Sequence, residues 1–221
     1  MAEIVDVRRS ILEANEAAAT QVRGQLARAL VVNLISSPGS GKTSLLEATM
    51  PAIKDSLSLA VIEGDIATDR DAQRLRALGV PAVQILTGGA CHLDARQVLK
   101  VLAEGHFQAP DVLFIENVGN LICPTSYDLG EDFKVALLSV TEGDDKPFKY
   151  PAIFATAQVT VITKVDLLPY VTFDLDAVKA QMRSLNPTGS ILLTSARTGQ
   201  GLDQWIGMLR SSLDAKRRAP A

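Results

Sequence analysis

The chain has 221 residues, of which 47% are hydrophobic and 21% charged, and its formal net charge is −3. This length and apolar content suit one α/β domain with a full-sized core. The slightly acidic balance argues against a nucleic-acid surface as the main partner. No apolar run is long enough to cross a bilayer and no signal-peptide pattern opens the chain, so we expect a cytoplasmic protein without a membrane partner.

The first segment of the chain has a helical pattern. Apolar residues recur at steps of three and four, at Ile4, Val7, Ile11, Ala14, Ala18, Val22 and Leu26. This is the spacing of one helix face. We therefore expect residues 1–28 to form an N-terminal helix that packs on the outside of the domain or against a second copy.

A short glycine-containing segment is the strongest functional signal. Ser-Ser-Pro-Gly-Ser-Gly-Lys-Thr at residues 36–43 follows the apolar run 31–35 and precedes a helical pattern. Strand, loop and helix in this order are typical of a phosphate-binding loop. The glycines let successive backbone N–H groups turn toward phosphate oxygens, and the helix N-terminus adds partial positive charge. The one departure is Ser36, which stands where the usual pattern has glycine.

The side chains of this loop have expected roles. Lys42 would reach the β- and γ-phosphates, and the Thr43 hydroxyl would hold Mg²⁺. The residues assigned to nucleotide binding here are Gly39, Ser40, Gly41, Lys42, Thr43 and Ser44.

Strand-like and helix-like patterns alternate along the rest of the chain. Strands are expected near 57–63, 80–86, 112–116, 135–140, 159–163 and 191–194, and helices near 69–77, 94–103, 175–185 and 202–213. A polar loop rich in Asp, Lys and Pro follows residue 140. This alternation predicts a P-loop NTPase fold, with a mainly parallel sheet and helices on both faces. We assign residues 29–215 to this domain and residues 216–221 to a disordered tail.

Two further segments indicate which base is bound. In Thr163-Lys164-Val165-Asp166, the Asp166 carboxylate can accept hydrogen bonds from N1–H and the exocyclic amine of guanine, whereas adenine has no donor at N1. Lys164 can cover the base with its methylene stem. Ser195 and Ala196, after the last strand, can offer backbone N–H groups to the guanine oxygen. We therefore expect a GTP/GDP site, although Thr163 replaces the usual asparagine.

Carboxylates at two other strand ends are candidates for Mg²⁺ and γ-phosphate sensing. Asp65 follows the second strand and Glu116 follows the strand 112–116, and either could hold Mg²⁺ directly or through water. The expected catalytic set is therefore Lys42, Asp65 and Glu116, with Thr43 as a further Mg²⁺ ligand. Asp69 and Asp71 are assigned to helix N-terminal charges. No glutamine or arginine is placed to orient water, so we expect slow hydrolysis.

Both cysteines lie just past predicted strands. Cys91 is followed directly by His92, and Cys123 follows the segment that begins with Glu116. Two thiolates and an imidazole form a soft, incomplete ligand set that suits Zn²⁺ or Ni²⁺. Water or a symmetry-related copy could complete it. From spacing alone, two inert cysteines remain the alternative, and a structural disulfide is not expected in a reducing compartment.

Five segments together resemble those of the hydrogenase nickel-incorporation GTPases, the HypB family. They are Ser-Ser-Pro-Gly-Ser-Gly-Lys-Thr, Glu-Gly-Asp-Ile-Ala-Thr-Asp, Gly-Gly-Ala-Cys-His-Leu, Glu-Asn-Val-Gly-Asn-Leu-Ile-Cys-Pro and Lys-Val-Asp-Leu-Leu-Pro-Tyr. The resemblance implies a homodimeric GTPase of the SIMIBI class that helps insert nickel into [NiFe]-hydrogenase. It also implies a metal site on Cys91, His92 and Cys123 at the dimer interface. An accessory nickel protein and the hydrogenase large subunit are the implied partners. The Cys-rich or His-rich N-terminal stretches of some members are absent here.

The spacing also suggests a mechanism. Only three residues separate Gly119 from Cys123, so a γ-phosphate and Mg²⁺ acting on residues 116–119 would move a metal ligand.

Three alternative functions remain: a urease-type nickel accessory GTPase, a cobalamin-enzyme GTPase chaperone, and a metal-binding GTP sensor with negligible turnover. The urease type usually carries a Cys-Pro-His cluster, whereas Cys123-Pro124 is followed by Thr125 here.

Overall fold

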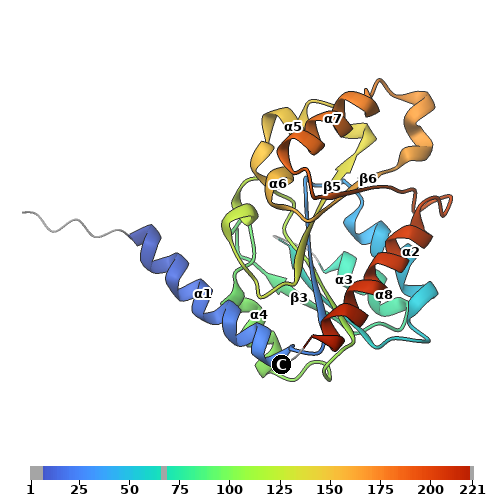
Figure 1. The fold of residues 1–221 in the computed structure, drawn as a ribbon. Helices are drawn as coiled ribbons and strands as arrows, with labels where there is room; N and C mark the ends of the chain where they lie inside the picture. The colour runs from blue at the N-terminus through green and yellow to red at the C-terminus, as the bar shows by residue number, and fades with distance from the viewer. Residues whose placement is uncertain (1–6, 66–68, 220–221) are drawn as a thin grey trace, which may run out of the picture.

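The computed structural model describes residues 7–65 and 69–219, with the side chains of residues 7–10 excluded. Its centre is a β-sheet, whose strands are drawn as arrows in Figure 1. The sheet has seven strands in the order β3-β2-β4-β1-β5-β6-β7, and every neighbouring pair is parallel. The strands are β1 Leu30–Ser36, β2 Leu59–Asp65, β3 Ala82–Leu86, β4 Val112–Glu116, β5 Phe133–Ser139, β6 Val159–Thr163 and β7 Ser190–Leu193. The predicted parallel sheet is confirmed.

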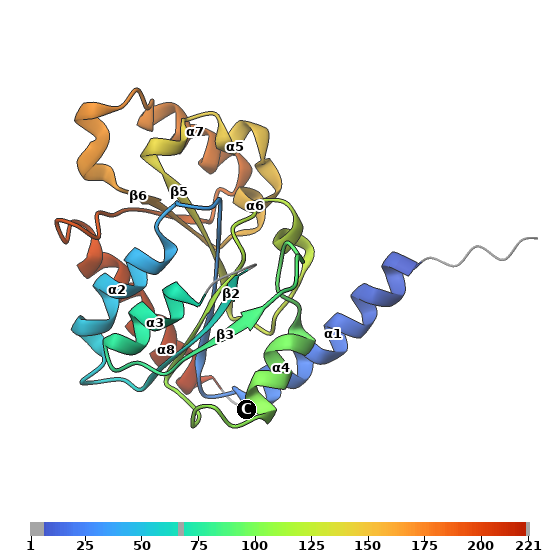
Figure 2. The same ribbon diagram turned by 180° about the vertical axis from the view of Figure 1, so that it is seen from behind.

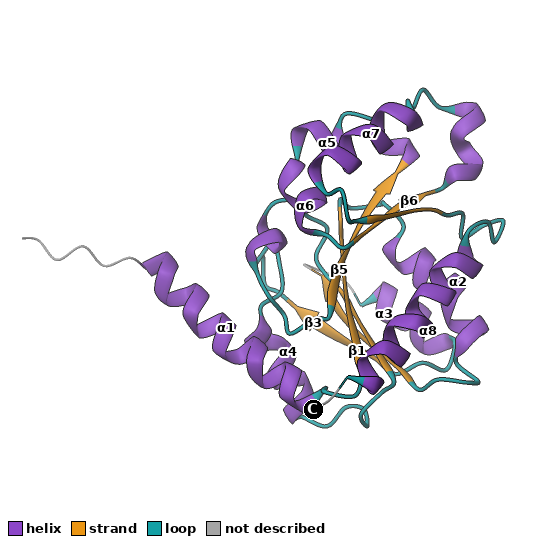
Figure 3. Cartoon of the chain, viewed as in Figure 1, coloured by secondary structure: helices purple, strands orange, loops and turns teal. Residues whose placement is uncertain are grey.

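Helices cover both faces of this sheet (Figure 3). They are α1 Val7–Gln25, α2 Lys42–Ile53, α3 Arg70–Ala77, α4 Ala95–Ala103, α5 Lys146–Lys149, α6 Pro151–Thr156, α7 Leu175–Leu185 and α8 Leu202–Arg218. One face packs against α2, α3 and α8 around the fully buried Trp205. The other packs against α1 and α4 beside β1, β2 and β4, and against α6 and α7 beside β5 and β6. Because both faces are covered, β1 is buried at every position.

The carboxyl ends of parallel strands share one edge of the sheet, and ligands of such folds bind there. β1 runs directly into the phosphate loop, and β2, β4 and β6 end at Asp65, Glu116 and Thr163. The topology therefore gathers the predicted motifs at one edge. The segment 66–68 of the Glu-Gly-Asp-Ile-Ala-Thr-Asp motif lies outside the described residues.

Two short helices, α5 and α6, replace the predicted polar loop after β5. Each has a proline within its first two positions, Pro147 in α5 and Pro151 in α6. Proline is well suited to a helix start, because its φ is fixed near the helical value and its missing N–H would have no partner there. Segments of four and six residues are too short to show a helical period, so the sequence pattern did not reveal them.

The prediction of a disordered tail from residue 216 is wrong for the described part of that segment. α8 continues through Arg218, and residues 220–221 lie outside the described range. Lys216 Nζ lies 2.7 Å from Asp132 Oδ2 and donates to the Leu26 carbonyl, and the Arg217 guanidinium pairs with Asp111. These contacts with distant residues fix the last turn, which a run of basic residues alone does not indicate.

The N-terminal helix α1 is only partly covered by the domain. Its C-terminal half packs on α4, and Val22 and Leu26 are buried on this side. Its N-terminal half extends away from the body of the molecule in both views (Figures 1 and 2), and Ile11 is 42% exposed. Ile4 of the predicted apolar face lies outside the described residues. No helix in the described part of the chain is both long and apolar enough to cross a membrane.

We expect Lys216→Met to lower the free energy of unfolding by about 1 kcal/mol, because a partly buried, charge-assisted hydrogen bond to Asp132 is lost. Urea unfolding followed by circular dichroism measures this change. Arg218→Met is the matched control, since Arg218 is exposed and its guanidinium lies 4.0 Å from the Asp214 carboxylate. Equal stability of the two variants would show that the Lys216–Asp132 contact contributes no more than the exposed Arg218–Asp214 pair.

Candidate nucleotide and metal sites

The phosphate loop between β1 and α2 has the backbone that its glycines predict. Gly39 and Gly41 have φ values of 76° and 94°, in the left-handed region that glycine tolerates without strain. Gly41 is the N-cap residue of α2, so the positive end of that helix faces the loop. Lys42 is 8% exposed and donates to the Ser36 hydroxyl over 3.1 Å. The unusual serine therefore contacts the lysine that is expected to bind phosphate.

Acidic side chains gather beside Thr43. The Thr43 hydroxyl donates to Glu116 Oε1 over 2.8 Å, and Glu116 lies opposite Glu63 in the register of β4 and β2. Oxygen atoms of Glu63, Asp71 and Glu116 all lie within 4.8 Å of one another. A cavity of about 490 Å³ is lined by these three side chains together with Lys42, Thr43 and Asp65. The structure thus brings Asp65 and Glu116 to one cavity, as the sequence predicts.

Glu63 was not singled out from the sequence, where Asp71 was assigned to a helix N-terminal charge. Asp71 does lie in the first turn of α3, but it also faces Glu63 and Glu116. The available signal for Glu63 was a carboxylate directly after the apolar residues Val61 and Ile62 of a buried strand. A buried charge without a partner is costly, so such a residue indicates a site.

Burial and like charges strongly perturb these carboxyl groups. Burial, followed by the nearby Glu116, raises the pKa of Glu63 to about 8. Burial also raises the pKa of Glu116, and Lys42 opposes this shift. One carboxyl oxygen of each glutamate is buried without a hydrogen-bond partner among the described residues. Oxygen-rich, partly unsatisfied carboxyl groups beside a threonine hydroxyl fit the ligand preference of Mg²⁺.

The predicted base-binding residues line a second cavity of about 530 Å³. Lys164, Asp166, Ser195, Ala196 and Ser44 all contribute to its wall. Lys164 has φ 57°, which is rare outside glycine, and its Nζ donates to the Gly39 carbonyl over 2.8 Å. This contact ties the base-binding loop to the phosphate loop.

Thr163, the departure from the usual asparagine, makes a similar connection. Its hydroxyl donates to the Ser40 carbonyl over 2.6 Å, and its side chain is buried. A threonine therefore keeps a link between the end of β6 and the phosphate loop, although it lacks the amide group.

The two cysteines and His92 form a compact group. Cys91 Sγ, Cys123 Sγ and a ring nitrogen of His92 all lie within 4.8 Å of one another, and all three residues are partly buried. Hydrogen bonding to the Cys123 thiol raises the pKa of Cys91, and burial lowers the pKa of His92. The Tyr127 ring contacts the His92 ring at a centroid distance of 3.9 Å. Three soft ligands at this spacing can hold Ni²⁺ or Zn²⁺ and leave a coordination position open.

The loops that carry these ligands touch the nucleotide site directly. A Cβ atom on Gly119 would fall 2.8 Å from the Pro38 side chain, so backbone of the loop that leads to Cys123 lies against the phosphate loop. Leu93, next to His92, donates its backbone N–H to the Asn117 side chain over 3.0 Å. Leu93 also packs on Gly64, at the end of β2, so closely that a Cβ atom there would fall 2.7 Å away.

Comparisons with known proteins agree with this geometry. Residues 30–192 match the family model described as CobW/HypB/UreG, nucleotide-binding domain. The hydrogenase maturation factor HypB of Escherichia coli K12 is 50% identical over 210 residues, which cover 94% of this chain and 72% of that protein.

Two solved structures share the fold closely. HypB from Archaeoglobus fulgidus superposes with a TM-score of 0.85 at 40% identity, covering 91% of this chain and all of that one. HypB from Helicobacter pylori, crystallised in complex with nickel, gives a TM-score of 0.86 at 39% identity and covers 94% of this chain and 99% of that one. On this evidence, the chain belongs to the CobW/HypB/UreG family of nucleotide-binding proteins and, within it, to the HypB hydrogenase maturation factors.

Proposed function

We propose that this protein is a GTP-hydrolysing metallochaperone that delivers nickel for [NiFe]-hydrogenase and whose nucleotide state controls its metal site. The observation that carries the proposal is the close contact between Gly119 and Pro38, because it joins the loop that leads to Cys123 to the phosphate loop. An accessory nickel protein and the hydrogenase large subunit are the proposed partners, by analogy with the role stated for the HypB relatives.

Guanine selectivity rests on Asp166 in the 530 Å³ cavity. Its carboxylate can accept from both donors on the Watson–Crick edge of guanine, whereas adenine would leave the charge without a partner. Lys164 and the backbone of Ser195 and Ala196 line the same cavity. Lys42 and the N-terminus of α2 provide positive charge for the phosphates.

Thr43, Glu116 and Asp65 are the proposed Mg²⁺ ligands, with Glu63 and Asp71 close enough to act through water. Mg²⁺ would supply neutralisation of the phosphate charge. The cavity that contains Lys42 and Thr43 is also lined by Arg74, but the Arg74 guanidinium is paired with Glu47 and Asp71. Among the described residues that line the cavity, none is a glutamine. We therefore propose slow intrinsic hydrolysis.

Nickel is the proposed cargo of Cys91, His92 and Cys123, with Zn²⁺ as the competing ion. Three protein ligands do not complete a tetrahedral or square-planar sphere. A second copy of the chain could supply the missing ligand and would make the metal site part of a homodimer interface. We propose that GTP favours this dimer, which sedimentation with GDP and with a non-hydrolysable GTP analogue would measure.

Two substitutions separate hydrolysis from metal binding. We expect Lys42→Ala to reduce GTP turnover at least about 100-fold, because the negative charge on the transferred phosphate would lose the ammonium group that lines the cavity. It should leave nickel bound to the protein.

Cys123→Ser should instead remove nickel from the protein and leave GTP turnover in place. Unchanged turnover in Lys42→Ala would identify the protein as a sensor without catalytic function, and full nickel content in Cys123→Ser would refute the metal site.

Glu63 gives a prediction about pH. Its pKa is near 8 in the folded protein, against an ordinary value of 4.5. The folded state therefore keeps a proton that the unfolded chain has lost, and stability falls as pH rises from 4.5 to about 8. Glu63→Gln should flatten this decline, whose slope is at most ~1.4 kcal/mol per pH unit. Urea unfolding without Mg²⁺ across this range measures the slope, and equal slopes in both proteins would contradict the assignment.

A further inference from the structure

Asn15 is a buried polar residue in the middle of α1, and its side chain connects two other segments. The residue is 3% exposed. Its amide nitrogen donates to the Asp128 carbonyl over 2.7 Å, and its amide oxygen accepts from the Ala95 backbone N–H over 2.8 Å. The partners fix the orientation of the amide, because a carbonyl can only accept and a backbone N–H can only donate.

Both partners lie close in sequence to the candidate metal ligands. Ala95 is the first residue of α4 and comes three positions after His92. The Ala95 N–H is one of the donors at a helix start that have no partner within the helix. The side chain of the N-cap residue Asp94 does not satisfy it, because that side chain accepts from the Gln97 backbone N–H. Asp128 comes five positions after Cys123. Its neighbour Tyr127 contacts the His92 ring.

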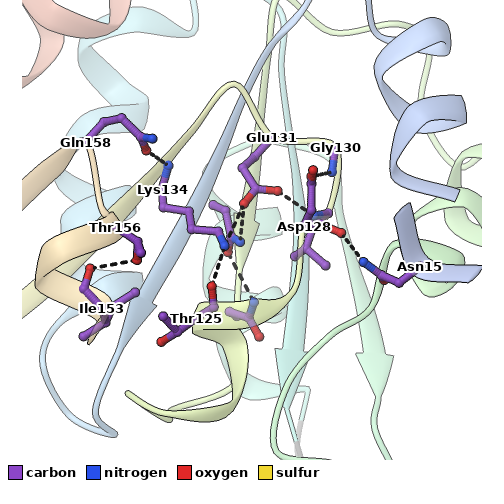
Figure 4. Close-up of polar contacts among 12 residues, drawn as sticks. Asn15, Thr125, Asp128, Gly130, Glu131, Lys134, Ile153, Thr156 and Gln158 are labelled. Atoms are coloured by element: carbon purple, nitrogen blue, oxygen red, sulfur yellow. Dashed lines mark hydrogen bonds and ion pairs between the residues drawn. The ribbon is translucent and has the colours of Figure 1, made fainter. Parts of the chain in front are cut away.

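Other contacts hold the same segment against α1. The Arg23 guanidinium makes a two-pronged ion pair with the Asp128 carboxylate, at 2.7 to 2.9 Å. The backbone of Gly130 lies so close to α1 that a Cβ atom there would fall 2.6 Å from the Val22 side chain. Lys134 holds the segment from the other side, since its Nζ donates to the Thr125 carbonyl over 2.8 Å (Figure 4). The chain from Cys123 to Gly130 is therefore supported at several points. Apolar residues of α1 also pack against α4, and among the side-chain hydrogen bonds of the described residues, those of Asn15 join this segment to the start of α4.

We propose that Asn15 is a positioning residue of the metal site, which holds the Cys91–His92 segment and the Cys123 segment at metal-binding distance from each other. α1 thereby controls how tightly the site binds metal, although no atom of α1 is among the candidate ligands. This role of Asn15 rests on the proposed function, because the metal ion concerned is the one proposed to bind Cys91, His92 and Cys123.

The expected effect follows from the loss of both hydrogen bonds. Asn15→Leu is close to isosteric but removes the hydrogen bonds that the described residues make to the Ala95 N–H and the Asp128 carbonyl. The two segments can then separate, and metal binding must first bring the ligands together. Removing a partner that orients metal ligands costs about 10- to 100-fold in metal affinity. We expect at least a ~10-fold loss of Ni²⁺ affinity in Asn15→Leu, with GTP turnover unchanged.

Two readouts test this on the 221-residue chain. The first is Ni²⁺ titration followed through the thiolate-to-nickel absorption bands. The second needs no metal: diamide oxidises the two thiols to one disulfide while it is reduced to its hydrazine. Cys91 and Cys123 are the only cysteines in the chain, so the intramolecular rate reports their proximity. Asn15→Asp keeps the acceptor for the Ala95 N–H but loses the donor to the Asp128 carbonyl. This variant replaces Asn15→Leu in the test if Asn15→Leu does not fold.

Arg23→Met is the matched control, because it removes the exposed ion pair between α1 and Asp128 while both Asn15 hydrogen bonds remain. The proposal predicts weaker Ni²⁺ binding and slower disulfide formation in the Asn15 variants and neither change in Arg23→Met. Unchanged values in the Asn15 variants, or equal losses in Arg23→Met, would overturn it. If the unaltered protein binds no Ni²⁺ through its cysteines, the proposed function fails, and the disulfide rates still decide whether Asn15 holds the segments together.

Discussion

The proposed coupling depends on one close contact, in which the backbone at Gly119 lies against Pro38 of the phosphate loop with no space for a side chain. Glu116 bonds Thr43 on one side of this contact, and Cys123 follows four positions after Gly119 on the other. A short, packed segment therefore spans the distance from the phosphate loop to the candidate metal ligand Cys123. Packed elements tend to switch between discrete arrangements rather than deform gradually. Any preference of the metal for one nucleotide state must then appear as an equal preference of the nucleotide for the metal-bound state.

Most of the fold and the location of most candidate site residues could be predicted from the sequence, because the signals are local. Buried parallel strands are continuous apolar runs, and the motif that ends at Lys42 and Thr43 fixes the start of α2. Parallel topology then requires the ends of β2, β4 and β6 to share an edge, so Asp65, Glu116 and Asp166 could be assigned to one region before their positions were known. The grouping of Cys91, His92 and Cys123 needed the family resemblance, since spacing alone left inert cysteines open.

The parts that were missed depend on contacts between distant segments. Lys216 at the chain end is fixed by Asp132, a partner 84 residues away that no local pattern reveals. Asn15 was not predicted to be buried, because the apolar face of the N-terminal helix was drawn through Ala14. The structure instead buries Asn15 together with Ala18, Val22 and Leu26. An asparagine on a buried helix face requires hydrogen-bond partners. The helical spacing of Asn15 with Ala18, Val22 and Leu26 could have indicated a buried, hydrogen-bonded side chain. Only the fold shows that its partners are Ala95 and Asp128.

The most direct test of the central claim is the Ni²⁺ affinity of the unaltered protein in three states: without nucleotide, with GDP and with a non-hydrolysable GTP analogue. The contact between Gly119 and Pro38 predicts that the affinities differ between the GDP and GTP-analogue states, by about 5- to 150-fold if the coupling is of ordinary size. The affinity for the GTP analogue, measured with and without Ni²⁺, must change by the same factor. Identical Ni²⁺ affinities in all three states would contradict the account, because the phosphate loop and the Cys123 segment would then be in contact without being coupled.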